Sequence, residues 1–234
     1  MALARRYENL DDVSCFHQGG GTLGLERREE ELGRLLVGDP FIDSVKQRYG
    51  LGHQRVLRAL EDLTDEQMRW HPGPDTHSIS WNVWHLGRWA DHLQAEISMM
   101  TPRLRELLGA GREIWETEAI AAKWGFDPNV LGWRQMGTDM DDDAAASLPF
   151  PHKETVVDYV RHTFDTAEHA VESISDEEFG VLYRSPHAWA GERVIGMYVV
   201  ALYAHDERHL GQIIYLRRLM ALPRKLERPG WTAA

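Results

Sequence analysis

The chain has 234 residues, of which 43% are hydrophobic and 27% are charged, an ordinary composition for a globular protein with one large domain or two small ones. Its formal net charge of −11 argues against binding to nucleic acid or to an anionic membrane surface, because both need basic residues. A single cysteine, Cys15, excludes a disulfide framework and a cysteine-rich zinc site.

The first 38 residues differ from the rest of the chain. They contain a flexible stretch, HQGGGTLG, and a charged stretch, LERREEELGRLL, that has only a small apolar face. We therefore predict a partly disordered N-terminal extension over residues 1–38, a domain over residues 39–222 and a C-terminal tail over residues 223–234. Since there is neither an apolar signal region nor a run of about 18 uncharged apolar residues, we expect a cytoplasmic protein.

Four long helices are predicted within the domain. The first begins at Pro40, and helical spacing places these apolar residues on its core side: Phe41, Val45, Tyr49, Val56, Leu60 and Leu63. The second runs from about Ser80 to Thr101, where Pro102 marks a break. The third covers residues 153–174 and the fourth about 192–222. Because strand-like alternation is absent, the predicted fold is all-α, a four-helix bundle.

Two matching turns suggest that this bundle is built from two equivalent helix pairs. LTDEQM and SISDEEF each contain a predicted capping box, Thr64 with Gln67 and Ser175 with Glu178. Each turn is followed by a loop containing proline and histidine, and then by a long helix. The second and fourth helices would then be equivalent partners.

A long irregular crossover, residues 111–152, is predicted between the second and third helices. Loops of this length inside a domain are usually functional or disordered. Three tryptophans in it, Trp115, Trp124 and Trp133, indicate that the crossover packs against the rest of the domain.

Three histidines form a candidate metal site. His205 and His209 are four residues apart and so lie on one helix face, the face that also carries Tyr198 and Leu202. His85 belongs to the apolar stripe of the second helix. Three neutral imidazoles leave one position on a divalent metal open, which is typical of a catalytic site. The predicted ligands are therefore His85, His205 and His209.

Other interpretations of the histidines remain open at this point. A buried histidine is often only a hydrogen-bonded core residue. His92 is seven residues from His85, so it could replace a ligand or face outward. We assign no role to His53, and we expect six further histidines to be exposed: His71, His77, His152, His162, His169 and His187. HDERH differs from the zincin motif by having Asp206 in place of glutamate. A di-iron site would need an acidic residue three positions before a histidine on each of two helices, and the second helix has no such pair.

Two segments resemble the signatures of the DinB-like (DinB/YfiT) superfamily. They are SISWNVWHLGRWADH, which follows the turn LTDEQM, and HDERHLGQIIYLRRL. GREIWETEAIAAKWGFDP is similar to a segment of actinobacterial members, although Glu118 and Ala119 stand where a glycine pair is expected. The resemblance covers residues 40–222 and implies a bundle with an up-down-down-up course. It also implies that His85, His205 and His209 bind one divalent ion: zinc, nickel, iron or manganese.

The resemblance also implies a function. Members of this superfamily include S-transferases and a maleylpyruvate isomerase that use mycothiol or bacillithiol. We therefore expect a metal-dependent transferase, or a related isomerase or hydrolase, that acts with a low-molecular-weight thiol on a small electrophile. Arg88 could receive an acidic group of the co-substrate or be solvated, and we assign no general base. The alternatives are a non-catalytic metal-binding or sensor module, and histidines that bind nothing. A homodimer is also in keeping with the resemblance.

Overall fold

The structure, a computed structural model, describes residues 39–73, 75–187 and 191–221. The predicted N-terminal extension (residues 1–38) and C-terminal tail (residues 223–234) lie outside the described residues. None of the described helices combines the length and the apolar character that crossing a membrane requires.

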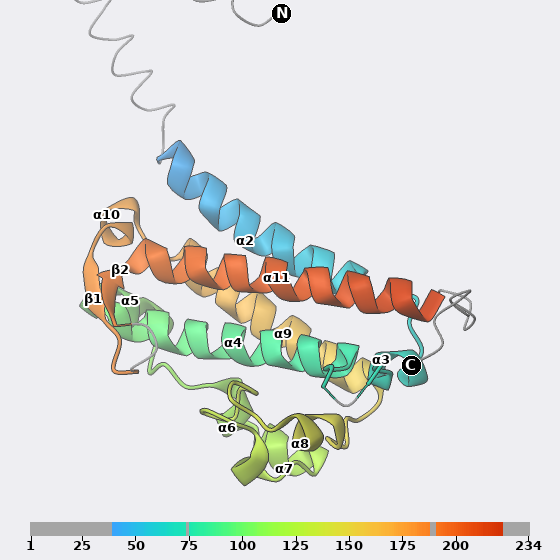
Figure 1. Cartoon of the computed structure of the whole chain (residues 1–234). Helices are drawn as coiled ribbons and strands as arrows, with labels where there is room; N and C mark the ends of the chain where they lie inside the picture. The colour runs from blue at the N-terminus through green and yellow to red at the C-terminus, as the bar shows by residue number, and fades with distance from the viewer. Residues whose placement is uncertain (1–38, 74, 188–190, 222–234) are drawn as a thin grey trace, which may run out of the picture. The chain divides into compact units, whose positions relative to one another are not determined.

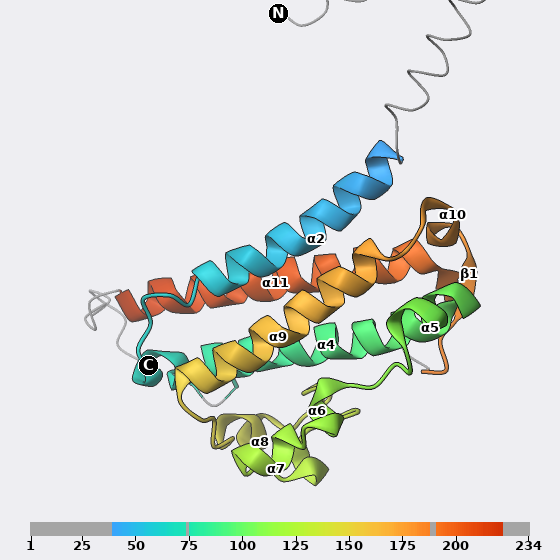
Figure 2. The same ribbon diagram turned by 180° about the vertical axis from the view of Figure 1, so that it is seen from behind.

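Four long helices form a bundle: α2 (Pro40–Arg58), α4 (Ile79–Met100), α9 (Lys153–Glu172) and α11 (Ile195–Ala221). Each packs against two others, because α4 contacts α9 and α11, while α2 contacts the same two helices. In Figure 1, α2 and α11 run in one direction and α4 and α9 in the opposite direction. Figure 2 shows α9 crossing between α2 and α4. The prediction of a helical fold is confirmed.

Short elements connect these helices. They are α3 (Asp65–Arg69), α5 (Pro102–Leu108), α6 (Ile114–Thr117), α7 (Ile120–Trp124), the 3-10 turn η1 (Pro128–Val130), α8 (Asp142–Ala146) and α10 (Asp176–Phe179). Both predicted capping boxes are confirmed, at the start of α3 and of α10. The break at Pro102 is confirmed as well, since Thr101 ends α4 and caps α5.

A small antiparallel hairpin precedes α11. It consists of β1 (Leu182–Arg184) and β2 (Glu192–Val194), so the prediction of helix from residue 192 is wrong and α11 begins at Ile195. The hydroxyl of Tyr198, in the first turn of α11, donates to the carbonyl of Gly191 at 2.9 Å. This bond, together with the strand pairing, fixes the segment before the helix as extended chain.

The core surrounds α4, which has 20 of its 22 residues buried. The flanks of α4 are covered by α9 and α11, and the crossover with α6, α7 and α8 lies along a further side in Figure 1. Trp115 and Trp124 of the crossover are buried and Trp133 is partly buried, as predicted. The prediction for Phe41 is wrong, because it is 69% exposed. The buried stripe of α2 starts at Ile42, about 100° further around the helix.

Candidate metal centre

The structure brings the three predicted histidines together, one from α4 and two from α11. One ring nitrogen of each lies within 4.8 Å of the others. Nε2 of His85 and Nε2 of His205 are 3.1 Å apart. Two imidazole nitrogens bound to one tetrahedral zinc ion would be about 3.4 Å apart, given bonds of about 2.0–2.1 Å. The donor set therefore fits a small divalent metal.

The outer nitrogen of two of the imidazoles donates a hydrogen bond to an oxygen atom. Nδ1 of His85 donates to the carbonyl of Met136, and Nδ1 of His209 donates to Oδ1 of Asn82 at 2.8 Å. Asn82 is itself oriented, because its amide nitrogen donates to the carbonyl of Ser78. Such bonds place the proton on Nδ1 and leave Nε2 free to bind a metal.

Burial keeps two of these imidazoles neutral. It lowers the pKa of His85 to about 3, and repulsion from His205 acts in the same direction. Burial, followed by repulsion from His85 and His205, lowers the pKa of His209 to about 2. Neutral imidazole is the form that binds a metal, so the site is ready for a cation at neutral pH.

The sequence model of the DinB superfamily matches residues 49–213 of the chain, and this range includes all three histidines. The chain belongs to the DinB superfamily. Its fold is similar to that of a conserved protein from Enterococcus faecalis known from a crystal structure. The TM-score is 0.59 at 19% sequence identity, and the similarity covers 76% of this chain and 96% of that one. A search of curated proteins found no match.

A second buried network in this DinB-superfamily protein lies behind His205. Oδ1 of Asp206 is 3.7 Å from Nδ1 of His205, and Oδ2 is 3.4 Å from Nε2 of His53. Nδ1 of His53 donates to Glu168 at 2.7 Å. Burial raises the pKa of Asp206, but contacts with His205 and His53 outweigh it and lower the pKa overall. The sequence indicates no role for His53, whereas the structure places it behind the candidate ligands.

The crossover closes over α4 beside the candidate metal centre. Gly137 has φ +83°, and a Cβ there would lie 2.8 Å from Trp81 and 3.2 Å from Nδ1 of His85. Only glycine combines this conformation with so close an approach. The backbone can therefore pass near enough for Met136 to accept the hydrogen bond from His85.

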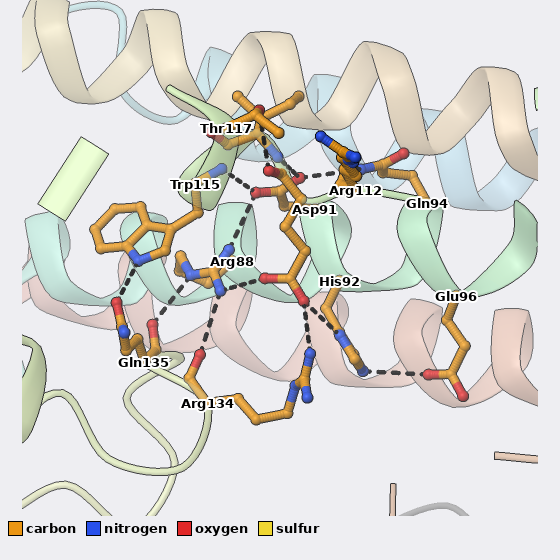
Figure 3. A network of polar contacts seen from close by, with 12 residues as sticks. Arg88, Asp91, His92, Gln94, Glu96, Arg112, Trp115, Thr117, Arg134 and Gln135 are labelled. Carbon is orange, nitrogen blue, oxygen red and sulfur yellow. Dashed lines mark hydrogen bonds and ion pairs between the residues drawn. The ribbon is translucent and has the colours of Figure 1, made fainter. Parts of the chain in front are cut away.

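Arg88 anchors the crossover and is bound by the protein's own carboxylates. It is 1% exposed and donates to Asp91 at 3.0 Å and to Glu113 at 2.6 Å (Figure 3). Asp91 also accepts from the backbone amides of Ile114 and Trp115, each at 2.8 Å. Arg88 also donates to the carbonyls of Gln135 and Arg134, so both interpretations of it from the sequence, solvated or binding a co-substrate, are wrong.

His92 is neither part of the triad nor exposed. It is 2% exposed and joins Glu96 and His187 in a second group whose donor atoms lie within 4.8 Å of one another. Glu96 follows His92 by four residues on α4, so this pair could have been found from helical spacing. His187 comes from the loop after β1, and no local pattern reveals its position.

Three of the six histidines that were expected to be exposed are exposed, and the other three, His71, His77 and His187, are partly buried. His152 and His162 have side chains that are 82% and 58% exposed, and His169 is exposed too. His77 is stacked on Trp81 with ring centroids 3.6 Å apart, which explains its partial burial.

Proposed function

We propose that the protein is a metal-dependent transferase that uses one divalent ion and joins a low-molecular-weight thiol, of the mycothiol or bacillithiol type, to a small electrophile. The observation that carries the proposal is the convergence of three imidazoles without a fourth protein donor in their group, within the described part of the chain. Three neutral ligands leave a coordination position for a substrate. The resemblance to thiol-dependent members of the superfamily supports the substrate class.

Two side chains could have closed the metal centre, and neither is placed to do so. His92 is held by Glu113 at 2.9 Å and by Glu96 at 3.1 Å. Asp206 lies beside Nδ1 of His205, which is the nitrogen away from the triad. This arrangement favours an enzyme over the alternative, a non-catalytic metal-binding or sensor module.

The bound ion would supply a Lewis acid that lowers the pKa of a thiol, so that the nucleophilic thiolate forms at neutral pH. The protein's own residues prepare the site for it. Met136 and Asn82 hold two imidazoles in place, and burial keeps them neutral. The side chain of His205 is 14% exposed, so this ligand is in contact with solvent.

The proposal is tested by incubating zinc-loaded protein with mycothiol or bacillithiol and monochlorobimane. The thiol sulfur displaces chloride, a C–S bond forms, the proton goes to solvent and the product fluoresces. We expect a rate above the uncatalysed one that is lost in His205→Ala and kept in His162→Gln, which changes an exposed histidine. An uncatalysed rate with both thiols, from protein that does bind zinc, would favour the non-catalytic module.

A further inference from the structure

A second set of metal-type donors lies two helical turns along α4 from His85. His92 and Glu96 come from α4 and His187 from the loop after β1, and one donor atom of each lies within 4.8 Å of the others. Seven residues of helix place His92 about 10.5 Å along the axis from His85. The ring of Trp89 lies between them, 6.3 Å from His85 and 6.1 Å from His92. The two groups are therefore distinct.

The donors in this second group are buried and poorly satisfied. His92 and Glu96 are 2% and 5% exposed. Nε2 of His92 faces Oε2 of Glu96 at 3.1 Å, while Oε1 of Glu96 has no hydrogen-bond partner among the described residues. A buried polar atom without a partner costs about 1–3 kcal/mol and calls for an explanation, such as a bound ion.

His92 is oriented as a metal ligand would be. Its Nδ1 donates to Oε1 of Glu113 at 2.9 Å, and Glu113 is held in turn by Arg88 at 2.6 Å and Arg134 at 3.1 Å (Figure 3). A carboxylate on the outer nitrogen is the usual support of a metal-binding histidine. A guanidinium nitrogen of Arg134 also lies 3.4 Å from Nδ1 of His187, a long contact that metal binding by that ring would replace.

The charges around the group are unbalanced in favour of a cation. Three buried carboxylates, Asp91, Glu96 and Glu113, stand with two guanidinium groups, Arg88 and Arg134. The arginines pair with Asp91 and Glu113, whereas the only ion pair that Glu96 makes within the described residues is with His92. Glu96 therefore depends on His92 alone for a compensating charge, and a bound cation would supply that charge instead.

An open pocket gives a cation access to these donors. It measures about 450 Å³ including its mouth, and its lining includes His92, Glu96, Glu116 and His187. Glu116 on the rim is exposed and adds further negative charge. A metal could therefore enter without unfolding the bundle.

We propose that His92, Glu96 and His187 form a second divalent-cation site, separate from the histidine triad. Two imidazoles and one carboxylate suit zinc or ferrous iron better than Mg²⁺ or Ca²⁺, which prefer oxygen ligands. Three protein ligands leave a position open to the pocket. This inference does not rest on the proposed thiol chemistry.

The experiment counts zinc ions bound to full-length protein that has been stripped with a chelator and carries no affinity tag. After dialysis against buffered Zn²⁺, elemental mass spectrometry should find about two equivalents in the wild type and about one in Glu96→Gln. His205→Ala should keep about one equivalent, and the double variant none. Excess Mg²⁺ should not displace the zinc. Glu116→Gln, a carboxylate of the same pocket outside the donor group, is the control and should bind like the wild type.

The outcomes separate this proposal from the triad. If Glu96→Gln does not fold, His187→Gln serves instead, because His187 is only partly buried and should lose the same equivalent. Binding that is lost in Glu96→Gln but unchanged in His205→Ala would support the second site and contradict the triad. Two results would overturn the second site. One is a wild type that binds a single equivalent of zinc and loses it in His205→Ala. The other is zinc binding at the wild-type level in both Glu96→Gln and His187→Gln.

Discussion

Two imidazoles of the triad are oriented by oxygen atoms from different parts of the chain. One is a backbone carbonyl of the crossover (Met136) and the other is a side chain of α4 (Asn82), whereas Nδ1 of His205 lies 3.7 Å from Asp206, beyond hydrogen-bond distance. Removing such an oxygen leaves the ligand in place but frees its ring to rotate. Metal affinity should therefore respond to residues that never touch the metal.

Asn82→Ala tests this at a single residue. We expect zinc affinity to fall about 10–100-fold, because His209 loses the group that fixes its proton on Nδ1. Competition with a chromophoric chelator measures the change. Asn129→Ala, at an exposed asparagine of η1, should leave the affinity unchanged. Equal affinity in wild type and Asn82→Ala would show that the hydrogen bond does not support the ligand.

Glu178 should make stability depend on acid pH. It accepts hydrogen bonds from Ser175, Thr101 and Arg103. Burial raises its pKa, but these contacts outweigh burial and lower the pKa to about 2. Since the unfolded value is about 4.3, the stabilisation is present above about pH 4.3 and is lost as the pH falls toward 2.

The measurement is urea unfolding of the wild type and Glu178→Gln. We expect the variant to be less stable by about 1–2 kcal/mol at pH 7, with the difference narrowing below about pH 4. Glu172→Gln, at an exposed glutamate of α9, should match the wild type at both pH values. A difference that stays constant with pH would mean that the charge of Glu178 does not stabilise the fold.

At the scale of elements, the sequence predicts features that depend on neighbouring residues but not contacts between distant segments. Capping boxes and the break at Pro102 depend on neighbouring residues, so their positions followed from the sequence. Helical phase likewise selected His85, His205 and His209, which the structure brings together. Helical phase does not predict the contacts of His92, because Glu113 belongs to the crossover and His187 to the hairpin loop. The hairpin itself depends on pairing between separate segments.

Arg88→Met tests how the crossover is held to α4. The substitution keeps much of the volume but leaves Asp91 and Glu113 without their buried partner, so we expect a loss of about 3–5 kcal/mol in the free energy of unfolding. Arg161→Met removes an exposed ion pair with Asp158 on α9 and should cost under about 0.5 kcal/mol. Similar small losses in both variants, measured by urea unfolding, would contradict the anchoring role of Arg88.

Ala119 occupies a backbone conformation that glycine prefers, since its φ is +51°. It stands where the resemblance leads one to expect a glycine. Ala119→Gly should raise the free energy of unfolding by about 0.5–1 kcal/mol. Ala122→Gly, within α7, should lower it by a similar amount, because that position is helical. Thermal or urea unfolding gives the sign, and destabilisation by Ala119→Gly would contradict strain at this position.

For the whole molecule, the central claim is that the bundle places three histidines of α4 and α11 around one divalent ion. Because a folded site binds metal better than the unfolded chain, zinc at a hundred times its dissociation constant should stabilise the fold by about 2.7 kcal/mol. The stabilisation would act on the packing of α4 against α11, the two helices that supply the ligands.

The most direct test is metal content by elemental mass spectrometry, on protein purified without an affinity tag. The first protein carries Glu96→Gln, so that only the triad binds metal. The second carries both Glu96→Gln and His205→Ala. We predict about one equivalent of zinc, nickel, iron or manganese in the first and none in the second. No metal in either protein, with a melting temperature that added divalent ions leave unchanged, would contradict the metal centre.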